Sequence, residues 1–144
     1  AGDPCCITFL DDMYVWNGTA WLPVASTVSS DPPRAVPRAY GHDMAWDAVR
    51  NQIIVTGGHV TSWGKPNTET WYVALSRSVT GTWQATWTLA TGIGCQATAG
   101  SAPDPVVHAG ARMAHDPVAG VHVLFGGFDP YDTSTAFGNT IECR

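Results

Sequence analysis

A nineteen-residue segment occurs twice in this chain: Tyr40 to Gly58 reads YGHDMAWDAVRNQIIVTGG, and Ala109 to Gly127 reads AGARMAHDPVAGVHVLFGG. The two copies align without a gap and are identical at seven positions. Each reads as a strand, a polar turn, an apolar strand and a glycine pair, which is the pattern of a β-hairpin. The repetition indicates a chain built from copies of one small β unit.

A second shared piece follows each glycine pair. Glu69 to Val73 corresponds to Asn139 to Cys143, and also to Asp11 to Val15 near the start. Two more hairpins are predicted, one turning at Asn17-Gly18 between strands 13–16 and 19–24, the other pairing 71–75 with 83–89 across 76–82. No segment shows sustained helical periodicity, so we predict an all-β fold.

Composition excludes several function classes. The 144 residues carry a net charge of −5 and only 13% charged side chains, with seven Trp and 15 Gly. Without a cluster of Lys or Arg, nucleic acid is not an expected partner. No apolar run approaches the roughly 20 residues that cross a bilayer, so membrane insertion is not expected either.

The spacing of aromatic residues after the glycine pairs resembles the kelch motif. Gly57-Gly58 is followed by Tyr72 and Trp83, and Ala1-Gly2 by Tyr14 and Trp21. The stretches DDMYVWNGTAWLPV and PRAYGHDMAWDAVRNQIIVTGG look like kelch repeats of secreted bacterial proteins. The third copy departs from the pattern, because Glu142 stands where tyrosine is expected, and the first has Ala1-Gly2 for the glycine pair.

The resemblance implies kelch-type β-propeller blades of four strands each. Residues 1–144 would form one segment of about two and a quarter blades, with blade parts at 1–25, 40–89 and 109–144. A closed propeller needs about four to eight blades. We therefore expect an incomplete propeller that is a piece of a longer chain, with a ring of copies as the alternative. Most tryptophans are predicted to pack between blades.

The same layout places the long connections at 26–39, 59–68, 90–108 and 128–138 on one face, where binding residues usually lie. The predicted binding residues are His59, Trp63 and Lys65 in one loop and Asp129, Tyr131 and Asp132 in its counterpart. The aromatic rings could stack on sugars or on a protein partner. The alternative interpretation is that they only hold their own loops together.

Metal binding is not predicted. Phe128 to Thr133 gathers oxygen ligands that suit calcium, but Asp129-Pro130 is also a turn pair, and turn formation is the preferred interpretation. His115 and His122 stand at the two ends of one hairpin and could face each other, yet no histidines have metal-ligand spacing. Asp47 and Asp116, at equivalent turns, are predicted turn formers.

Four cysteines, Cys5, Cys6, Cys95 and Cys143, are expected to form two disulfides in an oxidising compartment, with three pairings open. Buried free thiols are the alternative. Secretion would require that a signal peptide had already been removed before Ala1. The expected location is extracellular or at the cell surface.

Binding or structural assembly is the function expected from this pattern, with long loops presented on one face. Partners would be other protein chains or the rest of a longer propeller, and carbohydrate is a second ligand class. An enzyme is not predicted, because neither a Gly-x-Ser-x-Gly motif nor a spaced acid/base pair is found. The alternatives are a non-catalytic slice of an extracellular kelch enzyme, such as a galactose-oxidase-like copper oxidase, and a lectin assembled as an oligomeric propeller.

Overall fold

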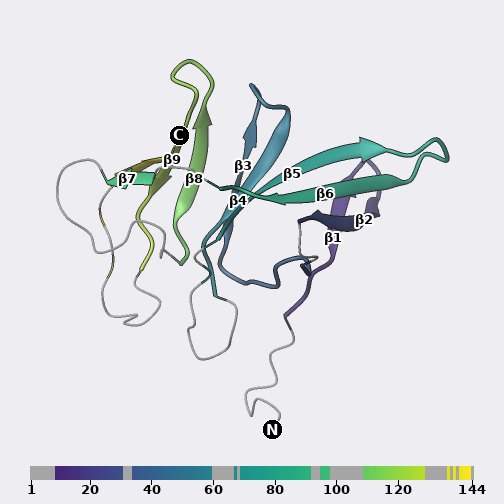
Figure 1. The fold of residues 1–144 in the computed structure, drawn as a ribbon, viewed down its shortest axis with the longest axis horizontal. Coiled ribbons are helices and arrows are strands. Elements are labelled where there is room, and N and C mark those ends of the chain that lie inside the picture. Colours follow the sequence, from purple (N-terminus) through teal and green to yellow (C-terminus); the bar gives the residue numbers. More distant parts are fainter. Residues whose placement is uncertain are drawn as a thin grey trace, which may run out of the picture.

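The described part of the chain contains ten strands and no helix, as a computed structural model shows (Figure 1). The all-β prediction is confirmed. The structure describes residues 9–30, 34–59, 67, 69–91, 95–97 (backbone only), 109–128, 136, 138 and 140–143. Within these ranges, no helix is long and apolar enough to cross a membrane.

Six strands form the first sheet, in the order β1-β2-β6-β5-β4-β3. Their bounds are β1 Met13–Trp16, β2 Trp21–Ser29, β3 Asp43–Asp47, β4 Gln52–Thr56, β5 Thr70–Arg77 and β6 Trp83–Leu89. The strands β3 to β6 form an antiparallel meander in chain order. This is the arrangement predicted for the complete four-stranded unit at 40–89.

One pairing in this sheet was not predicted. β2 runs parallel to β6 over six residue pairs, from Val24 opposite Trp83 to Ser29 opposite Thr88. The pairing lengthens β2 into the predicted 26–39 loop and joins the β1–β2 hairpin to the meander as one continuous sheet. The layout in separate blades is therefore not what the first sheet shows.

Four strands form the second sheet, in the order β7-β10-β9-β8. Their bounds are β7 Cys95–Ala97, β8 Arg112–Asp116, β9 Val121–Phe125 and β10 Thr140–Cys143. The hairpin β8–β9 and strand β10 lie where the repeat predicts them. β7 was not predicted, since it falls inside the 90–108 segment that was expected to be a loop.

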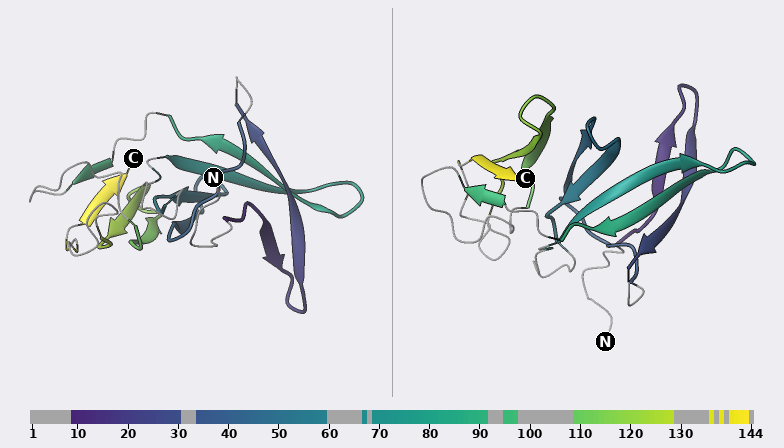
Figure 2. Two further views of the ribbon diagram at one scale, coloured as in Figure 1. Left: turned by 90° about the horizontal axis from the view of Figure 1, so that it is seen from below. Right: turned by 45° about the horizontal axis from the view of Figure 1, so that its top comes forward.

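The first sheet curls around its main core (Figure 2). Cross-strand neighbours share a face, so the alternation along the strands sends one set of apolar side chains to the inside of the curl. That set comprises Val24, Val55, Trp71, Val73, Ala85 and Trp87. A second, smaller core lies on one face of the β8–β10 sheet and comprises Ala111, Leu124, Ile141 and Cys143.

The tryptophans divide between core and surface. Trp71 and Trp87 are buried and meet edge to face, with ring centroids 6.5 Å apart. Trp16, Trp21 and Trp46 instead remain about half exposed or more, at 52%, 67% and 49%. Only part of the tryptophan content therefore packs within this chain.

The turn of the first hairpin is longer than predicted. The Oδ1 of Asn17 accepts hydrogen bonds from the backbone N–H groups of Thr19 and Ala20, at 2.9 and 2.8 Å. Because these two N–H groups bond to the asparagine, β2 begins at Trp21 instead of residue 19. Gly18 has the positive φ that the sequence predicted for this turn.

Both glycine pairs end their hairpins in the same way. After Gly57-Gly58, the backbone of His59 forms a two-way hydrogen-bonded bridge with Tyr40. After Gly126-Gly127, Phe128 forms the same bridge with Ala109. A Cβ atom on Gly58 would lie 2.6 Å from the carbonyl oxygen of Tyr40, and one on Gly127 would lie 2.9 Å from that of Ala109. The second glycine of each pair is required because the backbones approach too closely for a side chain.

We predict that Gly58→Ala destabilises the fold by about 2 kcal/mol or more, since it combines positive-φ strain with a backbone collision. Gly81→Ala is the matched control, because Gly81 has the same φ of +84° but nothing within 4 Å of the added Cβ. The control should lose only about 1 kcal/mol. Urea unfolding of both variants tests this, and equal losses would show that the close approach carries no cost of its own.

Candidate functional site

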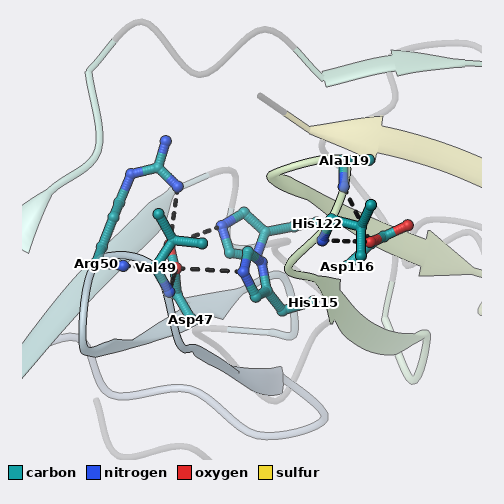
Figure 3. A network of polar contacts seen from close by, with 8 residues as sticks. Asp47, Val49, Arg50, His115, Asp116, Ala119 and His122 are labelled. Atoms are coloured by element: carbon teal, nitrogen blue, oxygen red, sulfur yellow. Dashed lines mark hydrogen bonds and ion pairs between the residues drawn. The ribbon is translucent and has the colours of Figure 1, made fainter.

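Three chemically active side chains meet where the two sheets pack together. Asp47 ends β3 of the first sheet, while His115 and His122 come from β8 and β9 of the second (Figure 3). The two histidines are direct cross-strand partners in the β8–β9 hairpin, so both rings project from the same face. The sequence prediction that they face each other is confirmed, with ring centroids 4.8 Å apart.

Asp47 is held by the turn that follows it. Its Oδ1 accepts hydrogen bonds from the backbone N–H groups of Val49 and Arg50, at 3.0 and 2.9 Å. Its Oδ2 accepts a hydrogen bond from the Arg50 guanidinium at 2.8 Å. These three hydrogen bonds come from residues of the same turn, so the orientation of the carboxylate does not depend on the second sheet.

The equivalent turn in the second copy shows which contacts of Asp47 belong to the turn and which are found only in the first copy. The Oδ1 of Asp116 accepts from the N–H groups of Val118 and Ala119, at 2.8 and 3.0 Å. Both aspartates are therefore turn formers, as predicted. Asp116 remains exposed, whereas the side chain of Asp47 is fully buried against the two histidines.

The histidines are as deeply buried as the aspartate. The side chains of His115 and His122 are 3% and 1% exposed, and each Nε2 lies 3.4 Å from a different oxygen of Asp47. These are ion-pair distances, but the groups are not aligned as hydrogen bonds. All four ring nitrogens of the pair lack a hydrogen-bond partner within the described residues.

The environment shifts the titration of this cluster. Burial works against ionisation of Asp47, but the hydrogen bonds from the backbone and side chain of Arg50 outweigh it and hold the pKa of Asp47 below its ordinary 3.8. Burial lowers the pKa of His122 below 6.5, and the Asp47 carboxylate only partly opposes that shift. The carboxylate is therefore charged and the His122 ring neutral near pH 7, which leaves an imidazole nitrogen lone pair free to bind a proton or a metal ion.

Backbone contacts keep the two sheets in register beside this cluster. The N–H of Gly110 donates to the carbonyl oxygen of Gly41 at 2.9 Å, joining equivalent glycines of the two copies. The N–H of Met113 donates to the carboxylate of Asp43. β3 and β8 accordingly run side by side in Figure 1. We call this contact between β3 and the β8–β9 hairpin the seam.

His59, a predicted binding residue, lies at the edge of the seam. Its ring is stacked between Tyr40 and Phe128, with centroid distances of 4.9 and 5.8 Å, and the residue is 3% exposed. This placement gives His59 a packing role between the two repeat bridges. Its role in binding stays a prediction.

The other predicted binding residues, Trp63, Lys65, Asp129, Tyr131 and Asp132, lie outside the described residues, as do Cys5 and Cys6. The same holds for most of the calcium candidate at Phe128 to Thr133. Cys143 is buried and disulfide-bonded, and the register of β10 and β7 sets it opposite Cys95.

A small hollow of about 100 Å³ opens on the inner side of the curled sheet. It is lined mainly by apolar side chains, together with Asp11, Asp12, His42 and Asn67. Arg38 pairs with Asp11 beside it, so one of these carboxylates is already neutralised. The hollow is smaller than an ordinary ligand pocket and is chemically less distinctive than the seam.

Sequence reasoning missed the part that Asp47 plays in the seam. The two histidines were visible as a hairpin pair, but nothing local in the sequence shows that a turn-forming aspartate of the previous repeat reaches them. The repeat itself was the available signal for this contact, because two consecutive units that pack against each other bring β3 against β8.

Comparison of the chain with known protein families and with curated proteins found no match.

We predict that Asp47→Ala costs about 2 to 3 kcal/mol of stability, since it removes the turn hydrogen bonds and leaves the Arg50 guanidinium without its acceptor. Asp116→Ala removes only the equivalent turn bonds and should cost clearly less. Chemical denaturation of both variants makes the comparison. Equal effects would mean that Asp47 acts only as a turn former.

Stability should also depend on pH through His122. Because its pKa is lowered in the folded chain, the unfolded chain binds a proton first, so stability is full above pH 6.5 and falls as the pH decreases below that value. His122→Gln should flatten this slope. Urea unfolding between pH 8 and pH 5 in EDTA measures the slopes, and an unchanged slope in His122→Gln would contradict the assignment.

Proposed function

We propose that this chain is a kelch-type propeller segment that works outside the cell or at its surface in binding or structural assembly. The support is that the hairpins of the two copies end in the same backbone geometry. Both glycine pairs are followed by the same backbone bridge, and β3 of one sheet lies against β8 of the other along the seam. Stacking of repeated β units in this way is how propeller blades are joined.

The observation that carries the assembly proposal is an exposed aromatic face on the β1–β2 hairpin. Tyr14, Trp16 and Trp21 are 50%, 52% and 67% exposed. Trp16 and Trp21 are cross-strand partners with ring centroids 5.5 Å apart, and Pro23 lies opposite Tyr14. Because Met13 and Val15 turn inward to the core, these four residues share the outer face, which we call the outer aromatic face.

Another β-sheet is the partner that this surface fits. The first sheet already contacts another sheet at β3, where Asp47 meets His115 and His122. On the outer aromatic face, a neighbouring blade would cover rings that are costly to leave in water. β1 is also an edge strand of its sheet, which offers backbone groups for pairing with another chain.

Carbohydrate binding is the second candidate, and the same rings favour it. A tilted pair of half-exposed tryptophans offers a broad apolar surface on which a sugar ring can stack. The two candidates differ in what covers the tryptophans. Assembly requires a second β-sheet there, whereas carbohydrate binding leaves the face open to a small ligand.

We predict that the purified chain self-associates through the outer aromatic face. In this experiment a second copy of the chain takes the place of the neighbouring sheet. Light scattering coupled to size exclusion at increasing concentration should show a discrete oligomer. The double variant Trp16→Ser/Trp21→Ser should shift it to the monomer. Val79→Ser is the control, since Val79 is also fully exposed but lies in the β5–β6 turn.

Each alternative gives a different result. A chain that is monomeric at all concentrations but binds glycans, with the binding lost in the double variant, would favour the lectin function. Stoichiometric copper with production of hydrogen peroxide in the natural full assembly would instead favour a slice of an oxidase. A double variant that assembles like the native chain would contradict the role of the outer aromatic face.

A further inference from the structure

We propose that Asp47, His115 and His122 bind one Zn²⁺ ion that fastens the two sheets together across the seam. The proposal concerns side chains that take no part in the outer aromatic face, so it stands apart from the proposed function. It rests on donor chemistry, donor spacing and burial.

The donor set is that of a zinc site. Imidazole nitrogen and carboxylate oxygen are the ordinary Zn²⁺ ligands, and two histidines with one carboxylate make up a common three-ligand set that leaves a fourth position for water. Within the described residues, these are the three side chains of metal-ligand type whose donor atoms all lie within 4.8 Å of one another. The donors are nitrogen and oxygen, with no carbonyl cage of the kind that calcium prefers.

The spacing of the donors agrees with tetrahedral coordination. Zn–N and Zn–O bonds of about 2.0–2.1 Å place neighbouring donors of a tetrahedron roughly 3.3–3.4 Å apart. The Nε2 atom of His115 lies 3.4 Å from Oδ1 of Asp47, and that of His122 lies 3.4 Å from Oδ2. The donor atoms of the three residues all lie within 4.8 Å of one another, so side-chain rotations bring them to the spacing that one ion requires.

The unpartnered ring nitrogens give an independent reason for a ligand. Leaving a polar group buried without a hydrogen bond is unfavourable, and here all four nitrogens of two nearly fully buried rings are in that state. The two rings also face each other, so protonating both would place like charges together. An ion bound to Nε2 of each ring satisfies one of the two nitrogens of each ring without that repulsion.

The groups around Asp47 hold its carboxylate in a fixed orientation, as the neighbours of a metal-binding carboxylate do. The N–H groups of Val49 and Arg50 and the Arg50 guanidinium fix the orientation of the carboxylate, as such partners do in known sites. The positive charge of Arg50 opposes a cation, but its side chain is 43% exposed, so water screens much of that charge.

The location indicates what the ion would do. One ligand belongs to the first sheet and two belong to the second, so binding links segments that are distant in the chain. All three side chains are almost completely buried, which suits a structural ion better than a catalytic one. The site is thus structural, acting as a clamp between consecutive repeats.

The test begins with the full chain treated with a chelator and then dialysed against Zn²⁺. We expect about one Zn²⁺ per chain by mass-spectrometric metal analysis and a rise in the thermal unfolding midpoint of about 5 °C or more. His115→Gln and His122→Gln should each reduce binding at least tenfold and lose the midpoint rise. Asp116→Asn, at the equivalent turn, and His42→Gln, at an exposed histidine, should behave like the native chain.

Co²⁺ binding to the native chain keeps the proposal testable if a histidine variant fails to fold. We expect the visible absorption of Co²⁺ bound to nitrogen and oxygen, without a thiolate charge-transfer band. A thiolate band would overturn the proposal, because it would place the ion on cysteine. Absence of stoichiometric Zn²⁺ binding, or equal binding by folded histidine variants, would overturn it as well.

Discussion

The fold depends on the close approach of two backbones at the second glycine of each glycine pair. Gly58 and Gly127 leave no space for a side chain, and each allows the following residue to bridge back to the residue before the hairpin. The bridges set where β3 and β8 begin, and through the Gly110–Gly41 hydrogen bond they set these strands beside each other. Without that placement, the histidine pair and Asp47 would belong to separate surfaces.

One consequence of repetition is that equivalent residues acquire different roles. Asp47 and Asp116 form the same turn with the same two backbone hydrogen bonds, yet only Asp47 is covered by a following repeat. The hairpin of the second copy supplies the covering histidines, whereas in the first copy the positions of His115 and His122 are held by Trp46 and Ile53. The polar cluster is therefore a property of the junction between two units and not of either unit.

The sequence predicted those features that local physics controls. The hairpins at 40–58 and 109–127, the glycine pairs and the aspartate turns follow from strand alternation and turn chemistry within a few residues. It did not predict the start of β2, which the Asn17 side chain delays, or β7, a strand of three residues in a segment without alternation. Nor did it predict the β2–β6 pairing or the meeting of Asp47 with the histidines, because both join segments whose proximity only tertiary packing determines.

The parallel pairing of β2 with β6 has a consequence for the order in which the chain folds. The meander from β3 to β6 is made of neighbours in sequence, so its strands pair after short loops close. Val24 and Trp83 are far apart in the sequence, and all of β3 to β5 lies between them. Pairing them before the meander has formed would close a long loop of unfolded chain, which is entropically costly. The β1–β2 hairpin is thus expected to dock late in folding, and until it does, β6 presents an open strand edge to other chains.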